Sequence, residues 1–387
     1  MGTSSRREFI KHTTFGGIAA GMGMMAAGLS PGKASGYNRV FYRDFGSTGF
    51  KASEIGFGVL HITDTALIHA ALDSGINYFD TAHGYMNGRC EETLGKVNKT
   101  RRKEYFLTTK VGGSDPEKMR KEIDISLKRL QTDCVDLLMS HGPSKKELIL
   151  NEDIIRVFDD ARKAGKTRFV GISTHNHDEV PDAVISSKFW EALLVPYNYF
   201  SPPKVTAYIK RAREAGIAVI GMKALITVER PRKPFPDIRE GKTNITNQQA
   251  LLKWVLNNPN VDTVIPGMSS FEHIADDTSV MGLKLTYEDH QILNRYSEAV
   301  KGHYCRGIAG CTGCRDKCPK GVDVCEINRC TNYAYGYENV TLARENHERL
   351  PESSRVAMCG DCEECEVKCA HGLDLTRTIN QAKELFA

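Results

Sequence analysis

The chain has 387 residues, of which 41% are hydrophobic and 26% charged, and its formal net charge is +4. This length allows a large buried core and more than one domain, and the composition is that of a soluble globular protein. Most of the net positive charge lies in residues 1–35, where four Lys or Arg stand against one Glu. Nucleic-acid binding needs Lys and Arg gathered on one face, so we expect no nucleic-acid partner.

The N-terminus reads as an export signal. Ser5-Arg6-Arg7-Glu8-Phe9-Ile10-Lys11 is followed by a mildly apolar stretch rich in Gly, Ala and Met over residues 13–29. This pattern resembles the twin-arginine signature, which implies that residues 1–35 direct the chain through the twin-arginine translocase to the periplasm. No clean Ala-x-Ala cleavage site follows, so an uncleaved membrane anchor is one alternative and a basic disordered tail is another.

Between residues 40 and 300, short apolar runs alternate with amphipathic stretches. The apolar runs predict eight strands, at residues 55–60, 76–80, 106–110, 135–140, 169–173, 192–196, 218–222 and 261–265. Helices are predicted between them, including residues 117–130, 153–164, 204–215, 247–256 and 271–280. Such an alternation over about 250 residues predicts an α/β fold, a (β/α)8 TIM barrel.

Four polar residues lie at or just beyond the ends of three of these strands. Asp80 ends the second strand and Tyr85 follows five residues later, whereas Lys110 ends the third strand and His141 follows the fourth. A parallel barrel presents its functional groups at the C-terminal ends of its strands. We therefore expect the four side chains to meet in one cleft.

An acid, a phenol, an amine and an imidazole that meet in one cleft can together transfer a proton. Tyr85 is the candidate general acid and base, and the ammonium of Lys110 would lower the pKa of its phenol. Asp80 would fix the position of Lys110, and His141 would orient the substrate oxygen. Taken singly, Asp80 could be a helix cap, His141 a core histidine and Lys110 a strand-end lysine with a buried stem.

Asp80, Tyr85, Lys110 and His141, in this order and context, resemble the catalytic tetrad of the aldo-keto reductases. The resemblance runs from about Phe45 to about Val300. It includes Gly46-Ser47-Thr48-Gly49, Glu91-Glu92-Thr93-Leu94-Gly95, Val170-Gly171-Ile172-Ser173 and Val264-Ile265-Pro266-Gly267. It implies a barrel of the aldo-keto reductase type that binds NADP(H) or NAD(H) and acts on a small carbonyl or alcohol substrate.

The same resemblance implies a set of cofactor-binding residues. They are Gly58, Asp80, Ser173, Thr174, Gly267, His273 and Asp277. No G-x-G-x-x-G follows a predicted strand, so the dinucleotide would be bound in the manner of the barrel and not of a Rossmann fold.

Several positions depart from the family pattern. Leu194 stands where a Gln usually contacts the nicotinamide carboxamide, and Gly221-Met222-Lys223-Ala224 stands where an aromatic residue often stacks on the ring. The Lys, Ser and Arg that usually grip the adenosine phosphate are replaced by Gly267, Met268 and His273. Asp276 and Asp277 place carboxylates near the ribose end, which would repel a 2′-phosphate and suit a free 2′-hydroxyl.

A long connection, residues 226–246, follows the seventh predicted strand. Long loops at the C-terminal face of a barrel tend to be lids or binding loops. Arg230, Arg232 and Lys233 in this segment could close over a cofactor phosphate, or they could belong to a solvated basic loop.

Ten of the twelve cysteines lie in the last part of the chain, residues 301–387, which we predict to be a small α-helical, ferredoxin-like domain. Cys359, Cys362, Cys365 and Cys369 have the spacing C-x2-C-x2-C-x3-C of bacterial ferredoxins, with Ala370 in place of the usual Pro. Upstream, Cys311, Cys314 and Cys318 form a shorter version followed by Pro319.

In ferredoxins the fourth cysteine of such a run ligates the other cluster. By that rule, one [4Fe–4S] cluster would be held by Cys318, Cys359, Cys362 and Cys365. A second would be held by Cys311, Cys314 and Cys369, with Cys305, Cys325 or Cys330 as the remaining ligand. The alternatives are zinc bound by C-x2-C pairs and disulfides in an exported protein.

Together, the two halves predict an exported aldo-keto reductase-like oxidoreductase with iron–sulfur centres for electron transfer, which could act with a redox protein partner. The alternative is an iron–sulfur electron carrier or redox-partner protein whose barrel has lost nicotinamide-dependent catalysis. Leu194, Gly267 and His273 favour that alternative.

Overall fold

The computed structural model describes residues 40–386, except 144, 226–244, 303, 336–339, 349, 361, 363 and 364. The predicted signal at residues 1–35 therefore lies outside the described residues, as do Arg230, Arg232 and Lys233 of the long loop. Among the helices that are described, none is both long and apolar enough to cross a membrane.

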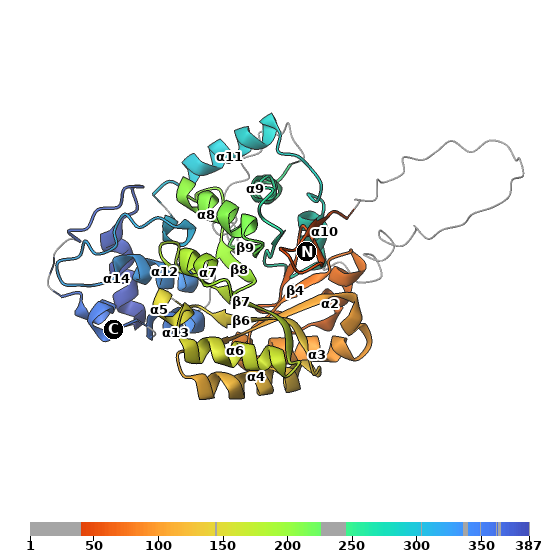
Figure 1. The fold of residues 1–387 in the computed structure, drawn as a ribbon. Coiled ribbons are helices and arrows are strands. Elements are labelled where there is room, and N and C mark those ends of the chain that lie inside the picture. Colours follow the sequence, from red (N-terminus) through yellow and green to blue (C-terminus); the bar gives the residue numbers. More distant parts are fainter. Residues whose placement is uncertain are drawn as a thin grey trace, which may run out of the picture.

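The core of the fold is a closed sheet of eight parallel strands (Figure 1). The strands are β3 (Phe57–Gly58), β4 (Tyr78–Asp80), β5 (Phe106–Gly112), β6 (Val135–His141), β7 (Thr167–Ser173), β8 (Ala192–Pro196), β9 (Ala218–Met222) and β10 (Thr263–Val264). Each pairs with the next along the chain. A parallel bridge between Ile55 and Val264 joins the first strand to the last and closes the barrel. All eight predicted strands are confirmed, although β3 and β10 are shorter than expected.

The helices that cover the barrel also follow the prediction. They are α2 (Thr65–Asp73), α3 (Arg89–Arg101), α4 (Pro116–Leu130), α5 (Lys146–Ile149), α6 (Glu152–Lys163), α7 (Val180–Ser187), α8 (Pro203–Glu214), α9 (Asn247–Leu256), α10 (Phe271–Thr278) and α11 (Tyr287–Ala299). Gly75, Gly165 and Gly216 have positive φ angles after α2, α6 and α8, where the chain turns sharply into the next strand.

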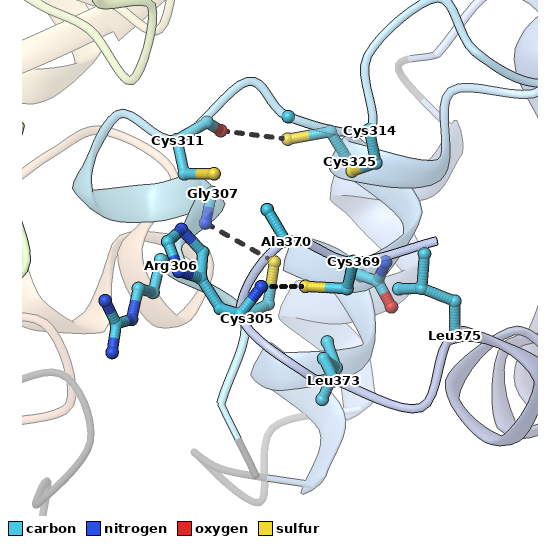
Figure 2. Close-up of a pocket in the computed structure, with 13 residues that line it drawn as sticks. Cys305, Arg306, Gly307, Cys311, Cys314, Cys325, Cys369, Ala370, Leu373 and Leu375 are labelled. Atoms are coloured by element: carbon cyan, nitrogen blue, oxygen red, sulfur yellow. Dashed lines mark hydrogen bonds between the residues drawn. The ribbon is translucent and has the colours of Figure 1, made fainter. Parts of the chain in front are cut away.

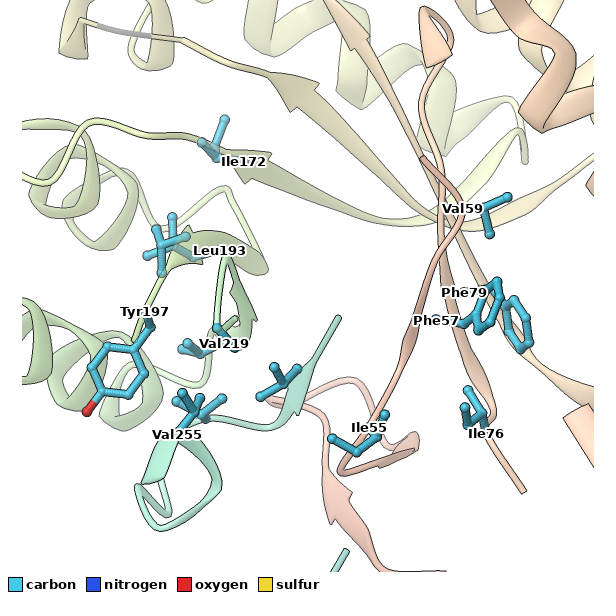
Figure 3. Packing of buried hydrophobic residues seen from close by; sticks show 14 of the residues in the cluster. Ile55, Phe57, Val59, Ile76, Phe79, Ile172, Leu193, Tyr197, Val219 and Val255 are labelled. Carbon is cyan, nitrogen blue, oxygen red and sulfur yellow. The ribbon is translucent and has the colours of Figure 1, made fainter. Parts of the chain in front are cut away.

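Alternating strand residues fill two separate layers. Phe79, Leu193 and Val219 point outward and pack with the helices in the large cluster of Figure 3. Their neighbours Tyr78, Leu194 and Ile220 fill the barrel interior. This division follows from the period of two in a strand, and it gives the barrel a solid core and not a pore.

A short hairpin, β1 (Tyr42–Asp44) with β2 (Lys51–Ser53), precedes the barrel. Phe45 in its connection packs on the interior layer, with its ring centroid 5.2 Å from Tyr78 and 5.1 Å from Phe106. These rings belong to the first residues of β4 and β5, so the hairpin plugs the N-terminal end of the barrel and leaves the opposite end for the site.

The cysteine-rich tail folds against one side of the barrel (blue in Figure 1). Its helices are α12 (Val324–Tyr335), α13 (Val340–Glu348) and α14 (Leu375–Phe386), with a 3-10 turn at Arg306–Ala309. The tail has its own small core, which includes Val322, Ile327, Val356 and Ile379. The predicted helical character of the tail is thus confirmed.

His177, in the loop after β7, joins the tail to the barrel. Its Nδ1 atom lies 2.7 Å from the hydroxyl oxygen of Tyr208, and its Nε2 atom lies 3.0 Å from the carbonyl oxygen of Ile308. A carbonyl can only accept, so Nε2 carries the proton and Nδ1 accepts from Tyr208. The neighbouring Asp178 forms ion pairs with Lys204 of the barrel and with Arg315 of the tail.

We predict that this joint weakens in acid. Burial lowers the pKa of His177 to about 4, whereas an unfolded histidine titrates near 6.5. Between these values the unfolded chain binds a proton that the folded chain does not. Stability is therefore lost as the pH falls from about 6.5 to about 4, by about 3 kcal/mol from this residue.

Urea unfolding across this pH range tests the prediction. His177→Gln should remove that part of the slope, because glutamine does not titrate. His290→Gln, an exposed histidine on α11, is the matched control and should keep the slope. Identical pH slopes for wild type and His177→Gln would contradict the assignment.

Candidate active site and cysteine pockets

The C-terminal ends of three neighbouring strands deliver the four predicted polar residues to one place. Asp80 is the last residue of β4, Lys110 lies in β5 and His141 ends β6. In the parallel register, Asp80 pairs with Thr108 and Gly112 pairs with His141. Tyr85 begins a short 3-10 helix after β4 (Tyr85–Gly88), in which Met86 and Asn87 have positive φ angles.

Lys110 is the centre of this site. Its Nζ donates to the carboxylate of Asp80, to the carbonyl oxygen of Thr81 at 2.8 Å and to the hydroxyl of Tyr85 at 3.4 Å. The ring of Tyr85 lies edge-on to that of His141, with centroids 5.7 Å apart. The structure therefore brings together all four residues that the sequence singled out.

Burial decides the protonation of the site. Lys110 and Asp80 are 1% and 2% exposed. Burial alone would lower the pKa of Lys110, but the nearby Asp80 and Tyr85 raise it overall, so the ammonium is charged at neutral pH. Burial raises the pKa of Asp80, and the charge of Lys110 opposes that rise.

The pKa of Tyr85 corrects one expectation. Burial raises this pKa above its usual value, and the ammonium of Lys110 only partly opposes the rise. Lys110 lowers the pKa of the phenol, as predicted, but the net pKa is not lowered. Desolvation of the phenolate outweighs the charge of Lys110, so the expectation of an unusually acidic phenol is wrong. The phenol stays protonated and is suited to donate a proton.

One oxygen of Asp80 is available to a ligand. Within the described chain, Asp80 Oδ2 and Thr81 Oγ1 are buried and have no hydrogen-bond partner. Buried polar atoms are usually paired, so two orphans beside a lysine and a tyrosine mark a place where a bound molecule supplies the missing hydrogen bonds.

The predicted cofactor residues lie along the same end of the barrel. Gly58 ends β3, where a Cβ atom would stand 3.6 Å from the carbonyl oxygen of Pro266. Ser173 ends β7, and the adjacent Thr174 donates its hydroxyl to the carbonyl of Pro143 at 2.8 Å. Both Ser173 and Thr174 are buried.

The remaining predicted cofactor residues lie in the loop before α10 and within that helix, whose last turn contains Asp277. Gly267 is exposed, and a Cβ there would meet nothing within 4 Å. The backbone N–H of Ser269 donates to His273 Nδ1 at 3.2 Å, and Ser270 caps the helix by accepting from the His273 N–H. Asp277 is fully buried. A helix N-terminus after the last strand is where barrels commonly bind phosphate, and Asp277 lies behind it, away from the surface.

The sequence interpretation missed three side chains beside the tetrad. Lys223 follows β9 directly, His175 lies two residues beyond β7, and Tyr333 comes from α12 of the tail. The Nζ of Lys223 stands 5.3 Å from the centroid of the Tyr333 ring. Lys223 and His175 lie just beyond strand ends, the feature that identified His141, so the sequence could have indicated them. Nothing in the sequence could place Tyr333 beside the tetrad.

The tail cysteines gather around two pockets (Figure 2 shows the first). The first pocket is lined by Cys305, Cys311, Cys314, Cys325 and Cys369. The second is lined by Cys318, Cys359, Cys362 and Cys365. All seven predicted metal ligands thus line one pocket or the other. They are divided as expected if the last cysteine of each run ligates the cluster of the other run. Cys330 lines neither.

The sulfur atoms of the first pocket differ in their hydrogen bonds (Figure 2). Cys305 accepts from the N–H of Gly307, and Cys369 accepts from the N–H of His371, both at 3.4 Å. Cys325 instead donates to the carbonyl oxygen of Cys311 at 3.7 Å. All twelve cysteines are described and carry free thiols. No three His, Cys, Asp or Glu side chains of the described chain converge on a point suited to a single metal ion.

Comparison with known proteins points to one family for the barrel. Residues 55–227 match the sequence pattern of the Aldo/keto reductase family. The chain is 26% identical to the aldo-keto reductase YhdN of Bacillus subtilis over 312 residues, covering 66% of this chain and 93% of that protein.

Solved structures resemble the same region. The holo form of the aldo-keto reductase AKR11C1 from Bacillus halodurans superimposes with a TM-score of 0.56 at 24% identity, covering 66% of this chain and 96% of that one. An aldo/keto reductase from Klebsiella pneumoniae in complex with NADP and acetate gives 0.58 at 23% identity, with coverages of 66% and 94%. These similarities support the fold of the barrel and leave about a third of this chain unmatched.

We predict that Lys110→Met strongly destabilises the protein. The substitution keeps the length of the side chain but leaves the buried carboxylate of Asp80 without its partner. Breaking a buried ion pair from one side costs about 3–5 kcal/mol, measurable by urea unfolding at neutral pH. The double variant Lys110→Met with Asp80→Leu should recover most of that loss, because it removes both charges. A single variant as stable as wild type would contradict the buried pair.

Proposed function

Because the barrel belongs to the aldo/keto reductase family, we propose that it reduces a small carbonyl compound, or oxidises the corresponding alcohol, with a nicotinamide cofactor. The observation that carries this proposal is the position of Lys110, whose ammonium contacts both the carboxylate of Asp80 and the hydroxyl of Tyr85. An acid, an amine and a phenol in this relation can move a proton to and from a substrate oxygen.

Each residue of the tetrad has a separate task. When bound, the nicotinamide supplies or accepts the hydride. Tyr85 donates the proton to the carbonyl oxygen in reduction, and its raised pKa keeps that proton in place until charge develops on the oxygen. Lys110 then stabilises the phenolate that remains, and Asp80 keeps Lys110 charged and fixed. His141, edge-on to Tyr85, orients the oxygen.

The residues present fit a nicotinamide cofactor in part. Asp80 Oδ2 can accept a hydrogen bond from a ribose hydroxyl, and the N-terminus of α10 with Ser269 and His273 can receive a phosphate. NADP is bound in the similar structure from Klebsiella pneumoniae. Asp276, half-buried in the last turn of α10, accepts from Gln249 and adds a carboxylate to this helix, which favours NAD(H) over NADP(H).

The tail holds two [4Fe–4S] clusters in this proposal. The support is the donor set: four thiols line the second pocket, and the first offers Cys311, Cys314 and Cys369 with a fourth sulfur nearby. Cys305 is the fourth ligand rather than Cys325, because its sulfur already accepts an N–H, as that of Cys369 does, whereas Cys325 donates. Such clusters transfer one electron at a time.

We also propose that the protein is exported. Residues 1–35 carry the twin-arginine-like signal, and this route would deliver a folded, cofactor-loaded protein to the periplasm. Mass spectrometry of the protein from the periplasmic fraction, with Arg6 and Arg7 intact or both changed to Lys, would test it.

A second function is favoured by one observation. Leu194 is 1% exposed and packs in the barrel interior, so no amide stands at the position that usually contacts the nicotinamide carboxamide. The barrel would then be a scaffold for an iron–sulfur electron carrier. Anaerobic titration with NADPH and NADH decides between the two, because only the enzyme shows tight nucleotide binding.

We predict that Tyr85→Phe lowers kcat by a factor of about 10² to 10⁴, the usual contribution of a positioned general acid. The ring and its contact with Lys110 remain, so cofactor affinity and unfolding should change little. Steady-state kinetics with NADPH or NADH and simple aldehydes measure the effect. Tyr42→Phe, at the opposite end of the barrel, is the control. Unchanged turnover in Tyr85→Phe would refute the role of Tyr85.

We also predict that anaerobically purified protein contains about eight iron atoms and as many acid-labile sulfides, as two [4Fe–4S] clusters require. Cys362→Ser should lose about half of both, and Cys305→Ser should lose about the other half. Cys325→Ser and Cys134→Ser should keep the full content. Zinc in place of iron, or full iron content in Cys305→Ser, would contradict the ligand assignment.

A further inference from the structure

Helix α12 of the tail lies at the mouth of the barrel. Tyr333, in its last turn, is 2% exposed, and its hydroxyl lies 3.5 Å from Nε2 of His175, two residues beyond the end of β7. The N-terminal part of the same helix contributes Cys325 and Asn328 to the first cysteine pocket. One helix therefore borders both the cysteine pocket and the site of the tetrad.

The tail itself holds Tyr333 in place. Arg329, one turn earlier, donates to the hydroxyl of Tyr333 at 3.0 Å and to Asn346 of α13 at 3.1 Å. Its guanidinium also pairs with Glu326. Hydrogen bonds within the tail thus help to set the position of the Tyr333 ring, and the barrel loops contact that ring through His175 and Lys223.

Lys223 meets this ring from the barrel side. Its backbone has a φ of 59°, a left-handed conformation that is uncommon for a lysine, and its carbonyl oxygen accepts from the side chain of Asn198 at 3.1 Å. Nonglycine residues in this conformation occur often at functional sites. The ammonium stands over the face of Tyr333, 5.3 Å from the ring centroid, in a cation–π arrangement.

The charge of Lys223 reaches the reacting group. It is one of the charges that partly oppose the rise in the pKa of Tyr85. Burial lowers the pKa of His175 well below its usual value, and Arg329 and Lys223 lower it further, so this imidazole is neutral. Lys223 therefore provides a positive charge between the proton donor and the tail.

We propose that Lys223, positioned by Tyr333 of the tail, binds the carboxylate of an oxo-acid substrate whose carbonyl faces Tyr85. The tail then forms a wall of the catalytic site and helps to select the substrate. This inference rests on the reaction proposed above, because it names the substrate class for the same site.

A carboxylate is the anion that this position suits. Among the described groups near the ammonium are Tyr85, His61, His175 and Tyr333, which border the reacting atoms and the tail. Helix α10, at whose start a cofactor phosphate would bind, instead packs against α2 and α9. In a partly buried site, a charge-assisted hydrogen bond from Lys223 would raise the affinity for a carboxylate over that for a neutral group by about tenfold or more.

The test compares matched aldehydes with and without a carboxylate. Succinic semialdehyde is paired with butanal, and glyoxylate with acetaldehyde. We expect kcat/KM to favour the oxo acid by about tenfold or more in the wild type. Lys223→Met should abolish that preference mainly through KM, Lys223→Arg should keep it, and Tyr333→Leu should weaken it. Tyr333→Phe, which keeps the ring, should retain most of it.

Lys118→Met, an exposed lysine on α4, is the matched control and should behave as wild type. A wild type without preference, or an undiminished preference in Lys223→Met, would overturn the inference. So would a loss of NADPH or NADH affinity in Lys223→Met with the preference intact, because the cofactor would then supply the anion.

Binding separates this inference from the proposed reaction. Calorimetry with γ-hydroxybutyrate and butanediol needs no turnover. Tighter binding of the acid by wild type, lost in Lys223→Met, would support the carboxylate site even if no aldehyde were reduced, in which case only the proposed reaction would fail. Equal binding of the two compounds would overturn the inference even in an active enzyme.

Discussion

The ion pair between Lys110 and Asp80 sets the constraint on which the catalytic end of the barrel depends. Both side chains are almost completely buried, and an isolated charge at this depth would be very costly. The pair is tolerated because Lys110 also donates to the carbonyl of Thr81 and to Tyr85, so most of its hydrogen bonds are made. Strands β4 and β5 must therefore keep their register, and the phenol is fixed as a consequence.

The same burial explains why the phenol is a donor in the resting site. Removing Tyr85 from water opposes the phenolate more than one ammonium favours it. A site arranged in this way keeps the proton until a substrate oxygen takes on negative charge. The ammonium then contributes most, because its charge is already in place and needs no rearrangement.

The tail is built onto this site and not simply attached to the end of a barrel. His177, Asp178 and His175 all lie in the loop after β7, and each contacts a residue of the tail. Helix α12 runs from the first cysteine pocket to Tyr333 at the barrel mouth. A single helix of the tail therefore touches both the first cysteine pocket and the loops at the catalytic end of the barrel.

The sequence by itself determined the barrel, the tetrad and the division of the cysteines. The strands could be predicted because apolar runs of this length recur with a regular spacing, and Asp80, Lys110 and His141 because strand ends in a parallel barrel share one face. Cys369 ends the C-x2-C-x2-C-x3-C run and Cys318 ends the shorter C-x2-C-x3-C run, and both could be assigned to opposite pockets because such short, local motifs have a geometry that the spacing fixes.

Only the tertiary structure decided the direction in which the pKa of Tyr85 shifts, the hydrogen bond of Cys305 and the position of α12. Desolvation depends on every residue that surrounds a group, so the sign of the shift at Tyr85 could not be read from Lys110 alone. Cys305 lies six residues before Cys311 and Cys325 seven residues after Cys318, so distance in the sequence barely separates them, whereas their hydrogen bonds differ. Tyr333 meets Lys223 across 110 residues, a contact that no local pattern encodes, because it arises from the docking of one folded unit on another.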